Sequence, residues 1–188
     1  MFGLEAWPAY LALVDEPVTL DEALSVDNGP AWKDAWESEL ASLPKNVTWV
    51  VEKVPAKRNI VGCRWLFRKK DDGRFKIRLI AKGYSQVPGT DFNETFAPVA
   101  KFTTQRVLLA LVAENDWELH SMDVKTAFLN SQLEEEIFME CPEGIPVIQE
   151  PGYACRLVKE IYGLRQSPPA WYQRLHTFFI KHEFHRST

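Results

Sequence analysis

The segment HSMDVKTAFLN, residues 120–130, contains a single carboxylate, Asp123, near the end of a stretch that we interpret as a β-strand. A carboxylate in this position binds Mg²⁺ when a second carboxylate converges on it, because Mg²⁺ prefers hard oxygen ligands. Two such ions about 4 Å apart stabilise both the attacking and the leaving oxygen in phosphoryl transfer. The alternative is that Asp123 caps the following turn, which is the commoner role of an Asp at a strand end.

Phe128 stands five residues after Asp123 and is the second candidate for a functional role. An aromatic ring here would lie under the sugar of a bound nucleotide and would clash with a 2′-hydroxyl, the group that separates ribonucleotides from deoxyribonucleotides. The alternative is that Phe128 belongs to the hydrophobic core. Its type and spacing leave both interpretations open.

Cationic side chains concentrate in residues 61–110, which hold 10 Lys and Arg against 4 Asp and Glu, although the whole chain has a net charge of −4. An Asp-Gly turn at residues 72–73 predicts a two-stranded ribbon with one apolar and one cationic face. The candidates for holding a triphosphate are Lys76, Arg78 and Lys82. The candidates for following a nucleic-acid backbone are Arg64, Arg68, Lys69 and Lys70, together with Lys76. The alternative is that these charges form an ordinary solvated face.

A glycine turn precedes the last predicted helix in the stretch YGLRQSP, from Tyr162 to Pro168. Such a turn exposes backbone N–H groups, which bind a phosphate or lie against a base pair. The alternative is an ordinary capped helix start.

Cysteine and histidine residues give no sign of a metal site. Cys63, Cys141 and Cys155 are scattered along the sequence without a CxxC pair, so we expect neither a disulfide framework nor a zinc ribbon. Only His182 and His185 have ligand-like spacing, and no thiol is close to them in sequence. We expect an intracellular protein, cytoplasmic or nuclear and not secreted, because the chain starts with a poor signal peptide. No stretch is long enough to span a bilayer, so no membrane partner is expected.

The segments that must position these residues mix helices and strands, which predicts an α+β fold. The expected helices cover residues 28–43, 103–115 and 167–184. The expected strands lie within residues 46–55, 63–83, 117–124, 137–140 and 153–164. Thr103 or Thr104 would cap the second helix, and Ser167 would cap the third with Pro168 at the first helical position. The first helix carries an apolar face formed by Trp32, Ala35, Trp36, Leu40 and Leu43.

Six segments follow one another in a specific order: NVTWVV, GCRWLFRKK, IRLIAKGYSQVPGTDFNETFAPVAKF, MDVKTAFLN, LEEEIFMECPEG and CRLVKEIYGLRQSPPAWY. This order resembles the reverse transcriptases of copia-type LTR retrotransposons, over Asn46 to about Phe184. Residues 17–43 also resemble the segment that precedes the polymerase core in those polyproteins. The resemblance implies a leader segment at residues 1–45 with one amphipathic helix, and the N-terminal part of a reverse transcriptase domain at residues 46–188.

The fold that the resemblance implies is the fingers and an incomplete palm of a right-hand polymerase. The fingers would come from about residues 46–101 and 132–160, and the partial palm from about 102–131 and 161–188. The implied activity is template-directed addition of dNTPs, with Mg²⁺ as cofactor and an RNA or DNA primer–template as partner.

The resemblance also assigns roles to single residues. Asp123 would be the first catalytic metal ligand, with the Val124 carbonyl beside it, and Phe128 would be the sugar gate. The turn at Tyr162 and Gly163 would line the incoming nucleotide and the template base. Two phosphate contacts would come from Arg78 and Lys82.

Two departures from the family pattern affect these expectations. Pro169 stands where the family usually has a basic residue, which puts a template contact there in doubt. No Asp follows Asp123, whereas the family's second metal motif, aromatic-x-Asp-Asp, lies further downstream. We therefore expect a polymerase fragment that is inactive alone, with a nucleic-acid-binding or a protein-interaction remnant as alternatives. The last helix would leave a partly exposed aromatic stripe that favours self-association, formed by Trp171, Leu175, Phe178, Phe179 and His182.

Overall fold

The computed structural model describes residues 16–145 and 151–185, so the first fifteen residues of the expected leader lie outside the described part. Two helices open this part, α1 (Leu20–Ser25) and α2 (Gly29–Lys45). The sequence predicts α2 but not the short α1, which begins where the Thr19 hydroxyl accepts the backbone N–H of Glu22. The described part of the leader therefore holds the expected helix, α2, and a short helix before it.

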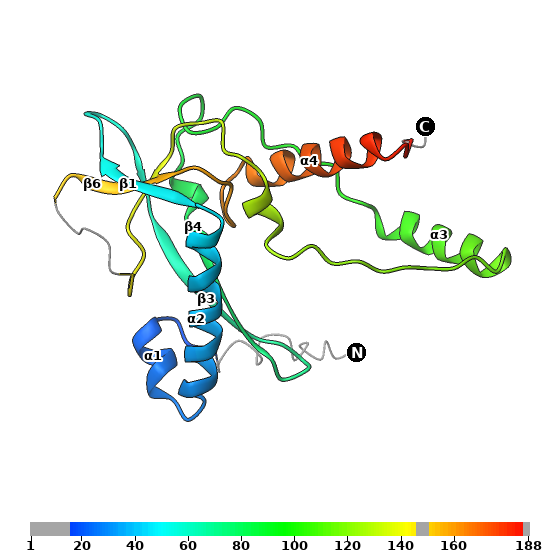
Figure 1. Cartoon of the computed structure of the whole chain (residues 1–188), viewed down its shortest axis with the longest axis horizontal. Coiled ribbons are helices and arrows are strands. Elements are labelled where there is room, and N and C mark those ends of the chain that lie inside the picture. Colours follow the sequence, from blue (N-terminus) through cyan, green and yellow to red (C-terminus); the bar gives the residue numbers. More distant parts are fainter. Residues whose placement is uncertain (1–15, 146–150, 186–188) are drawn as a thin grey trace, which may run out of the picture.

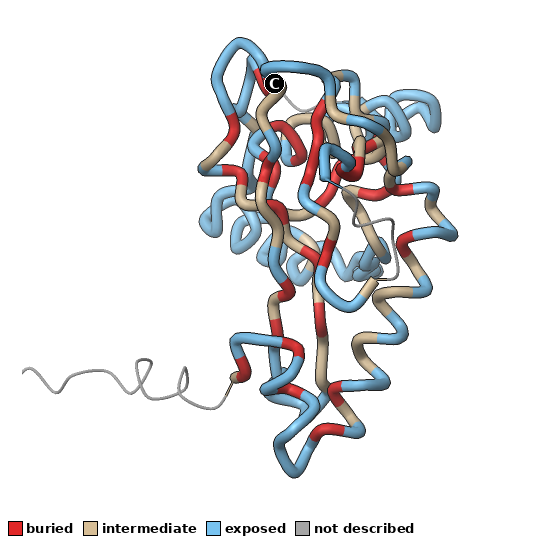
Figure 2. The backbone as a smooth tube through the Cα atoms, turned by 90° about the vertical axis from the view of Figure 1, so that its left-hand side faces the viewer, coloured by how far each residue is buried: buried red, intermediate tan, exposed pale blue. Residues whose placement is uncertain are grey.

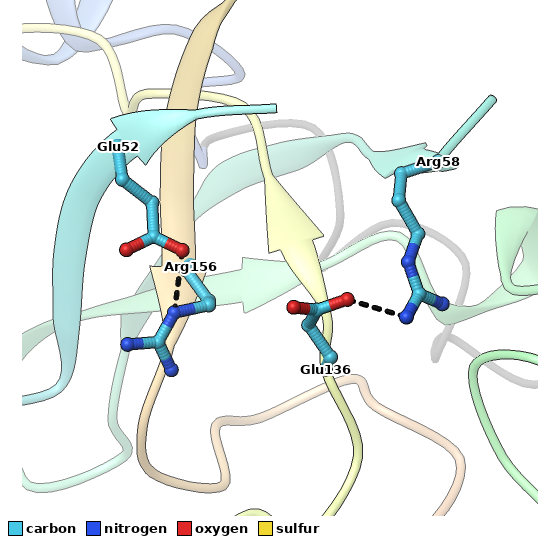
Figure 3. A network of polar contacts seen from close by, with 4 residues as sticks. All are labelled: Glu52, Arg58, Glu136 and Arg156. Atoms are coloured by element: carbon cyan, nitrogen blue, oxygen red, sulfur yellow. Dashed lines mark hydrogen bonds and ion pairs between the residues drawn. The ribbon is translucent and has the colours of Figure 1, made fainter. Parts of the chain in front are cut away.

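A four-stranded sheet, here called sheet A, joins segments from both ends of the chain. Its strands, in spatial order, are β1 (Trp49–Lys53), β6 (Tyr153–Leu157), β5 (Phe138–Met139) and β2 (Ile60–Val61). β6 runs antiparallel to both of its neighbours, and β2 pairs with β5 in parallel. Two ion pairs lie across this sheet, Glu52 with Arg156 at 2.7 Å and Arg58 with Glu136 (Figure 3). The three strands predicted for this region are confirmed.

The predicted two-stranded ribbon is present as β3 (Cys63–Lys69) and β4 (Phe75–Ala81), paired antiparallel. Its turn has Gly73 at φ +82°, a conformation that costs glycine little. The apolar face is buried and carries Trp65, Phe67, Ile77 and Leu79. The opposite face carries the cations, as the alternation of residue types predicts.

Helix α2 covers the apolar face of the ribbon, beside β3 and β4 (Figure 1). The Trp32 ring meets Phe67 and Phe75 edge to face, with centroid distances of 5.6 and 4.6 Å. The Glu39 carboxylate accepts the backbone N–H of Leu79 at 3.4 Å, on the edge of β4 that faces away from β3. This contact satisfies one N–H group of that strand edge.

Helix α3 (Phe102–Glu114) lies apart from the body of the molecule, carried by two extended segments (Figure 1). None of its residues is buried, and the exposed colour of this region is seen in Figure 2. Its N-cap is Lys101 without a side-chain bond, so the predicted caps, Thr103 and Thr104, are wrong. This helix therefore lacks both a side-chain cap at its start and burial of its apolar residues.

The strand predicted at residues 117–124 is wrong, because this stretch has no regular secondary structure. A β-strand needs a neighbour for its N–H and C=O groups. Within residues 16–145 and 151–185, no strand pairs with this segment. Asp123 therefore lies in an exposed extended segment and not at a strand end.

Helix α4 (Ser167–Lys181) confirms the last predicted helix, but its start is shifted by one residue. The N-cap is Gln166, and Ser167 is the first helical residue because its hydroxyl is engaged by Glu160 and the Ile161 carbonyl. The distal half of the expected aromatic stripe is exposed, with Phe178 at 55% and Phe179 at 38%. Among the described helices, none combines the length and apolar character that crossing a membrane requires.

Candidate functional site

Three residues singled out from the sequence meet in one cluster, formed by Arg78, Phe128 and Tyr162. The rings of Phe128 and Tyr162 meet edge to face, with centroids 4.8 Å apart. The Arg78 guanidinium carbon lies 5.0 Å from the centroid of the Tyr162 ring, within the range of a cation–π contact. This aromatic–arginine cluster joins the ribbon, the segment after Asp123 and the turn before α4.

Backbone contacts place the Tyr162 ring in this cluster. The Tyr162 carbonyl accepts the Ala81 N–H at 2.8 Å, which docks the turn on the end of β4. Gly163 has φ +93°, and a Cβ added to it would lie 2.1 Å from the Ala81 carbonyl oxygen. A Cβ on Gly83 would lie 2.0 Å from the Gly163 carbonyl oxygen. Glycine is therefore required at both positions for the two backbones to approach.

Phe128 reaches the cluster from a short 3₁₀ helix, η3 (Ala127–Asn130), which packs against α4. Thr126 precedes it with φ +50°, and the Asn130 side-chain amide donates to the Thr126 carbonyl at 3.1 Å. Phe128 itself is half-buried. Its ring is therefore accessible from one side while Tyr162 supports it from another.

A buried amide network, which the sequence does not predict, holds the same turn from behind. Gln86 donates to the Gln166 side chain at 3.0 Å, and its own amide oxygen accepts the Arg165 N–H at 2.8 Å. Gln166 in turn donates to the Asp91 carbonyl at 3.0 Å. The Asp91 carboxylate accepts from the Asn59 side chain and from a backbone N–H. All three of Gln86, Asp91 and Gln166 are at least 95% buried, so they fix the loop 83–92 against the start of α4.

Positive charge at the cluster is incompletely neutralised. The Nε of Arg78 is buried and has no hydrogen-bond partner among the described residues. Burial lowers the pKa of Lys76, and the nearby charges of Arg78 and Lys70 lower it further, whereas Glu39 and Asp123 act in the opposite direction. Arg78 as a whole is half-buried, and a guanidinium beside another cation is suited to bind an anion such as a phosphate through its accessible nitrogens.

Asp123 and Val124 are both exposed, and the influence of Asp123 on Lys76 places it near the ribbon. Among residues 16–145 and 151–185, no group of three His, Cys, Asp or Glu side chains has the geometry to hold a metal ion. Magnesium sites in phosphoryl transfer need more than one carboxylate, so the residues described here do not form a complete one. Asp123 offers a single ligand only.

The remaining cations of the ribbon differ in whether a carboxylate pairs with them. Arg64, Lys69 and Lys70 are exposed, whereas Arg68 is paired with Glu16 at 3.1 Å. Glu16 also accepts the backbone N–H of Lys69 at 3.0 Å. The leader residue Glu16 therefore neutralises one of the expected nucleic-acid contacts.

Lys82, the last expected phosphate contact, lies at the base of the ribbon. Its methylene stem packs beside Gly62, where an added Cβ would lie 2.9 Å from the Lys82 Cδ. The same Cβ would lie 3.3 Å from the Glu140 Oε2, so a carboxylate shares this neighbourhood. Of the two expected phosphate contacts, Arg78 is the one that the structure places against Tyr162.

A groove of about 720 Å³ runs along the first turns of α4, lined in part by Ser131, Glu135, Glu160 and Gln166. Burial raises the pKa of Glu160 to about 7, Glu135 and Glu134 add to the rise, and the hydrogen bond between Glu160 and Ser167 opposes it. The Ser167 Oγ lies 2.6 Å from the Glu160 Oε2 and 2.7 Å from the Ile161 carbonyl. One hydroxyl hydrogen cannot serve both contacts, so both are satisfied only when Glu160 is protonated and donates to Ser167.

Comparison with known proteins identifies the family of the chain. A family model described as reverse transcriptase (RNA-dependent DNA polymerase) matches residues 46–188. The chain is 43% identical over 176 residues to the retrovirus-related Pol polyprotein from transposon RE2 of Arabidopsis thaliana, covering 90% of this chain and 12% of that protein. It is 42% identical over 168 residues to the one from transposon TNT 1-94 of Nicotiana tabacum, covering 87% and 13%. For transposon RE1 of Arabidopsis thaliana the identity is 41% over 176 residues, covering 90% and 12%.

No solved structure matches the chain. The chain spans only 12 to 13% of the length of these relatives, so it matches one part of each of those polyproteins. The family match nevertheless covers residues 46–188, well over half of the chain. The chain therefore belongs to the reverse transcriptase family of copia-type LTR retrotransposons.

Proposed function

We propose that this chain supplies the fingers and part of the palm of a right-hand RNA-directed DNA polymerase. The observation that carries the proposal is the aromatic–arginine cluster, where the Arg78 guanidinium lies against Tyr162 and the Tyr162 ring lies against Phe128. In this arrangement Arg78 binds a phosphate of the incoming dNTP, and Phe128 faces its sugar. The turn at Tyr162 and Gly163 lies against the base, as the family resemblance implies.

The ribbon would follow the primer–template with its cationic face. Arg64 and Lys70 are exposed and project from an element that the core holds in place. Contacts of this kind bind phosphates without reading sequence. An intracellular location, cytoplasmic or nuclear, is part of the same proposal, since such a protein works on nucleic acid.

Asp123 would contribute the first metal ligand of the polymerase, and Mg²⁺ bound there would stabilise the charge that develops during nucleotidyl transfer. These 188 residues contain no Asp after Asp123, and the described part does not complete a metal site. We therefore propose that the chain binds substrates but does not extend a primer by itself. Carboxylates from another part of the polyprotein would have to join Asp123.

Two measurements on the purified chain test this function. With Mg²⁺ present, we expect a fluorescent dNTP to bind and no dNTP to be incorporated into a primer–template. Arg78→Gln should weaken dNTP binding by about 10-fold or more, because a charge-assisted hydrogen bond is lost. Arg74→Gln is the matched control, since Arg74 lies at the exposed tip and pairs with Asp72. Incorporation by the chain alone, or equal weakening by both variants, would contradict the proposal.

A second candidate function is a non-enzymatic interaction module. The observation that favours it is the exposed distal face of α4, including Phe178 and Ile180. Such an apolar surface favours self-association or a protein partner. Size-exclusion chromatography with light scattering distinguishes the two candidate functions. A monomer at all accessible concentrations counts against the interaction module and does not affect the proposal of substrate binding.

A further inference from the structure

Three thiols that are distant in the sequence lie close together in the fold. The Cys155 Sγ is 3.7 Å from the Cys141 Sγ, and Cys63 donates to the Glu140 carbonyl at 3.5 Å. The cysteines are scattered along the sequence, and their spacing gives no sign of this proximity. The reason is strand pairing, since Met139 of β5 pairs with Cys155 of β6 and Cys141 lies just beyond Met139.

The pair formed by Cys141 and Cys155 has the contact from which a disulfide forms. An S–S bond is about 2.05 Å long, so the two sulfurs, now 3.7 Å apart, must approach by less than about 2 Å. Cys155 is buried, whereas Cys141 is partly exposed. An external oxidant therefore reaches Cys141 first, and Cys155 is in place to react with it.

The surroundings of the thiols slow their reaction near neutral pH. Burial raises the pKa of Cys155, with further contributions from Cys141 and Cys63, and burial also raises the pKa of Cys63 to about 12. The thiolate is the reactive form, so these buried thiols react slowly near neutral pH. Within the described residues, the three thiols do not form a group that could hold a metal ion.

We propose that Cys141 and Cys155 form a reversible redox pair, which a peroxide converts into an intramolecular disulfide. The peroxide O–O bond breaks, its oxygen converts the Cys141 thiol into a sulfenic acid, and one water leaves. The Cys155 sulfur then attacks the Cys141 sulfur, the S–S bond forms, and a second water leaves with the displaced oxygen. In total two thiols lose two electrons and two protons, and one peroxide becomes two waters.

The bridge would tie the end of β5 to β6 within sheet A. Intracellular disulfides of this kind are transient and sense oxidants. Closing the loop between Cys141 and Cys155 restricts the unfolded chain, so the oxidised form should resist urea better than the reduced form.

The test is mass spectrometry of the purified chain after exposure to hydrogen peroxide without reductant. We expect the intact mass to fall by that of two hydrogen atoms and to recover with dithiothreitol. A glutamate-specific protease cuts after Glu143, between the two cysteines, so a bridge joins two separate peptides. Oxidation should be faster at alkaline pH, where more thiolate is present.

Cysteine variants identify which two residues form the disulfide. Cys63→Ser should retain the mass loss, and Cys141→Ala should abolish it, with circular dichroism confirming that both remain folded. The peptide map of the unmodified chain decides the matter even if a variant fails to fold. Added oxygen on Cys141 without a bridge, a bridge to Cys63, or a bridge only between two chains would overturn the proposal.

Discussion

Phe128 and Tyr162 meet edge to face, with ring centroids 4.8 Å apart and ring planes at 74°. Phe128 belongs to η3, just after Asp123, and Tyr162 belongs to the turn that Ala81 holds at the end of β4. The proposed sugar gate is thereby supported by the residue that the family resemblance places against the base. A change at either ring is expected to affect how the other is held.

Phe128→Ala removes this support and the ring that would exclude a 2′-hydroxyl. We predict that the purified chain binds dNTP better than rNTP and that this preference falls toward equality in the variant. Loss of the aromatic pair should also lower the free energy of unfolding by roughly 0.5–1.5 kcal/mol. Competition between dNTP and rNTP for a fluorescent dNTP measures the preference. Phe96→Ala is the control, because Phe96 is 81% exposed, and an unchanged preference in Phe128→Ala would reject the gate.

Nucleic-acid binding by the ribbon should depend on salt. For a duplex, each lost phosphate contact is expected to reduce the slope of the logarithm of the binding constant against the logarithm of the salt concentration by about 0.9. We predict this reduction for Arg64→Gln, and a smaller one for Arg68→Gln because Glu16 already neutralises Arg68. Glu16→Gln should tighten binding by freeing Arg68. Fluorescence anisotropy over a range of salt concentrations gives the slopes.

Lys33→Gln is the matched control for this series, since Lys33 lies on α2 and pairs with Glu37 at 3.8 Å. Its slope should equal that of the unmodified chain. Equal slopes for all variants would show that the ribbon does not contact the nucleic acid.

Gly163→Ala should destabilise the fold strongly, because the new Cβ would lie 2.1 Å from the Ala81 carbonyl oxygen. Gly73→Ala is the matched control, with a similar φ of +82° and no atom within 4 Å of the added Cβ. We expect Gly73→Ala to cost about 1–2 kcal/mol from its left-handed conformation alone, and Gly163→Ala to cost clearly more. Urea unfolding measures both, and similar midpoints would contradict the close approach of the two backbones.

Stability should depend on pH through Glu160, whose pKa burial raises from 4.5 to about 7. Between these two values the folded chain keeps a proton that the unfolded chain has lost, so the contribution of Glu160 is complete below the lower value. The contribution of Glu160 to the free energy of unfolding falls as the pH rises and is lost above about pH 7. The total change in the free energy of unfolding is up to about 3 kcal/mol. Glu160→Gln should remove this dependence, because the amide still donates to Ser167 but does not titrate.

Urea unfolding at about pH 5 and at about pH 8 measures the effect. Glu134→Gln, at an exposed neighbour, should keep most of the dependence. If the unmodified chain were equally stable at both pH values, Glu160 would not be protonated in the folded state.

Sequence patterns predicted the elements that depend only on residues close together in the chain. The alternation around Trp65 and Phe67 and the turn at Gly73 define the ribbon, and both are confirmed. Residues 117–124 have the composition of a strand but no partner in the described part, so pattern alone was insufficient there. The start of α4 was misplaced by one residue because Glu160, distant from any cap pattern, engages the Ser167 hydroxyl.

The candidate site was only partly predictable. Arg78, Phe128 and Tyr162 were singled out by the family resemblance, and the structure brings them together. Gln86 and Gln166 were not, because polar residues in a Gly- and Pro-rich segment are usually exposed. Their burial depends on the meeting of two segments that no local pattern relates.

The pairing of β1 with β6 has a consequence for synthesis of the protein. The ion pair from Glu52 to Arg156 spans 104 positions of the chain. At roughly 5–20 residues per second, a ribosome takes about 5–20 s to deliver β6 after β1 has been made. During that interval the edge of β1 that pairs with β6 has unpaired N–H and C=O groups, so the nascent chain is a natural client for chaperones that shield unpaired strands.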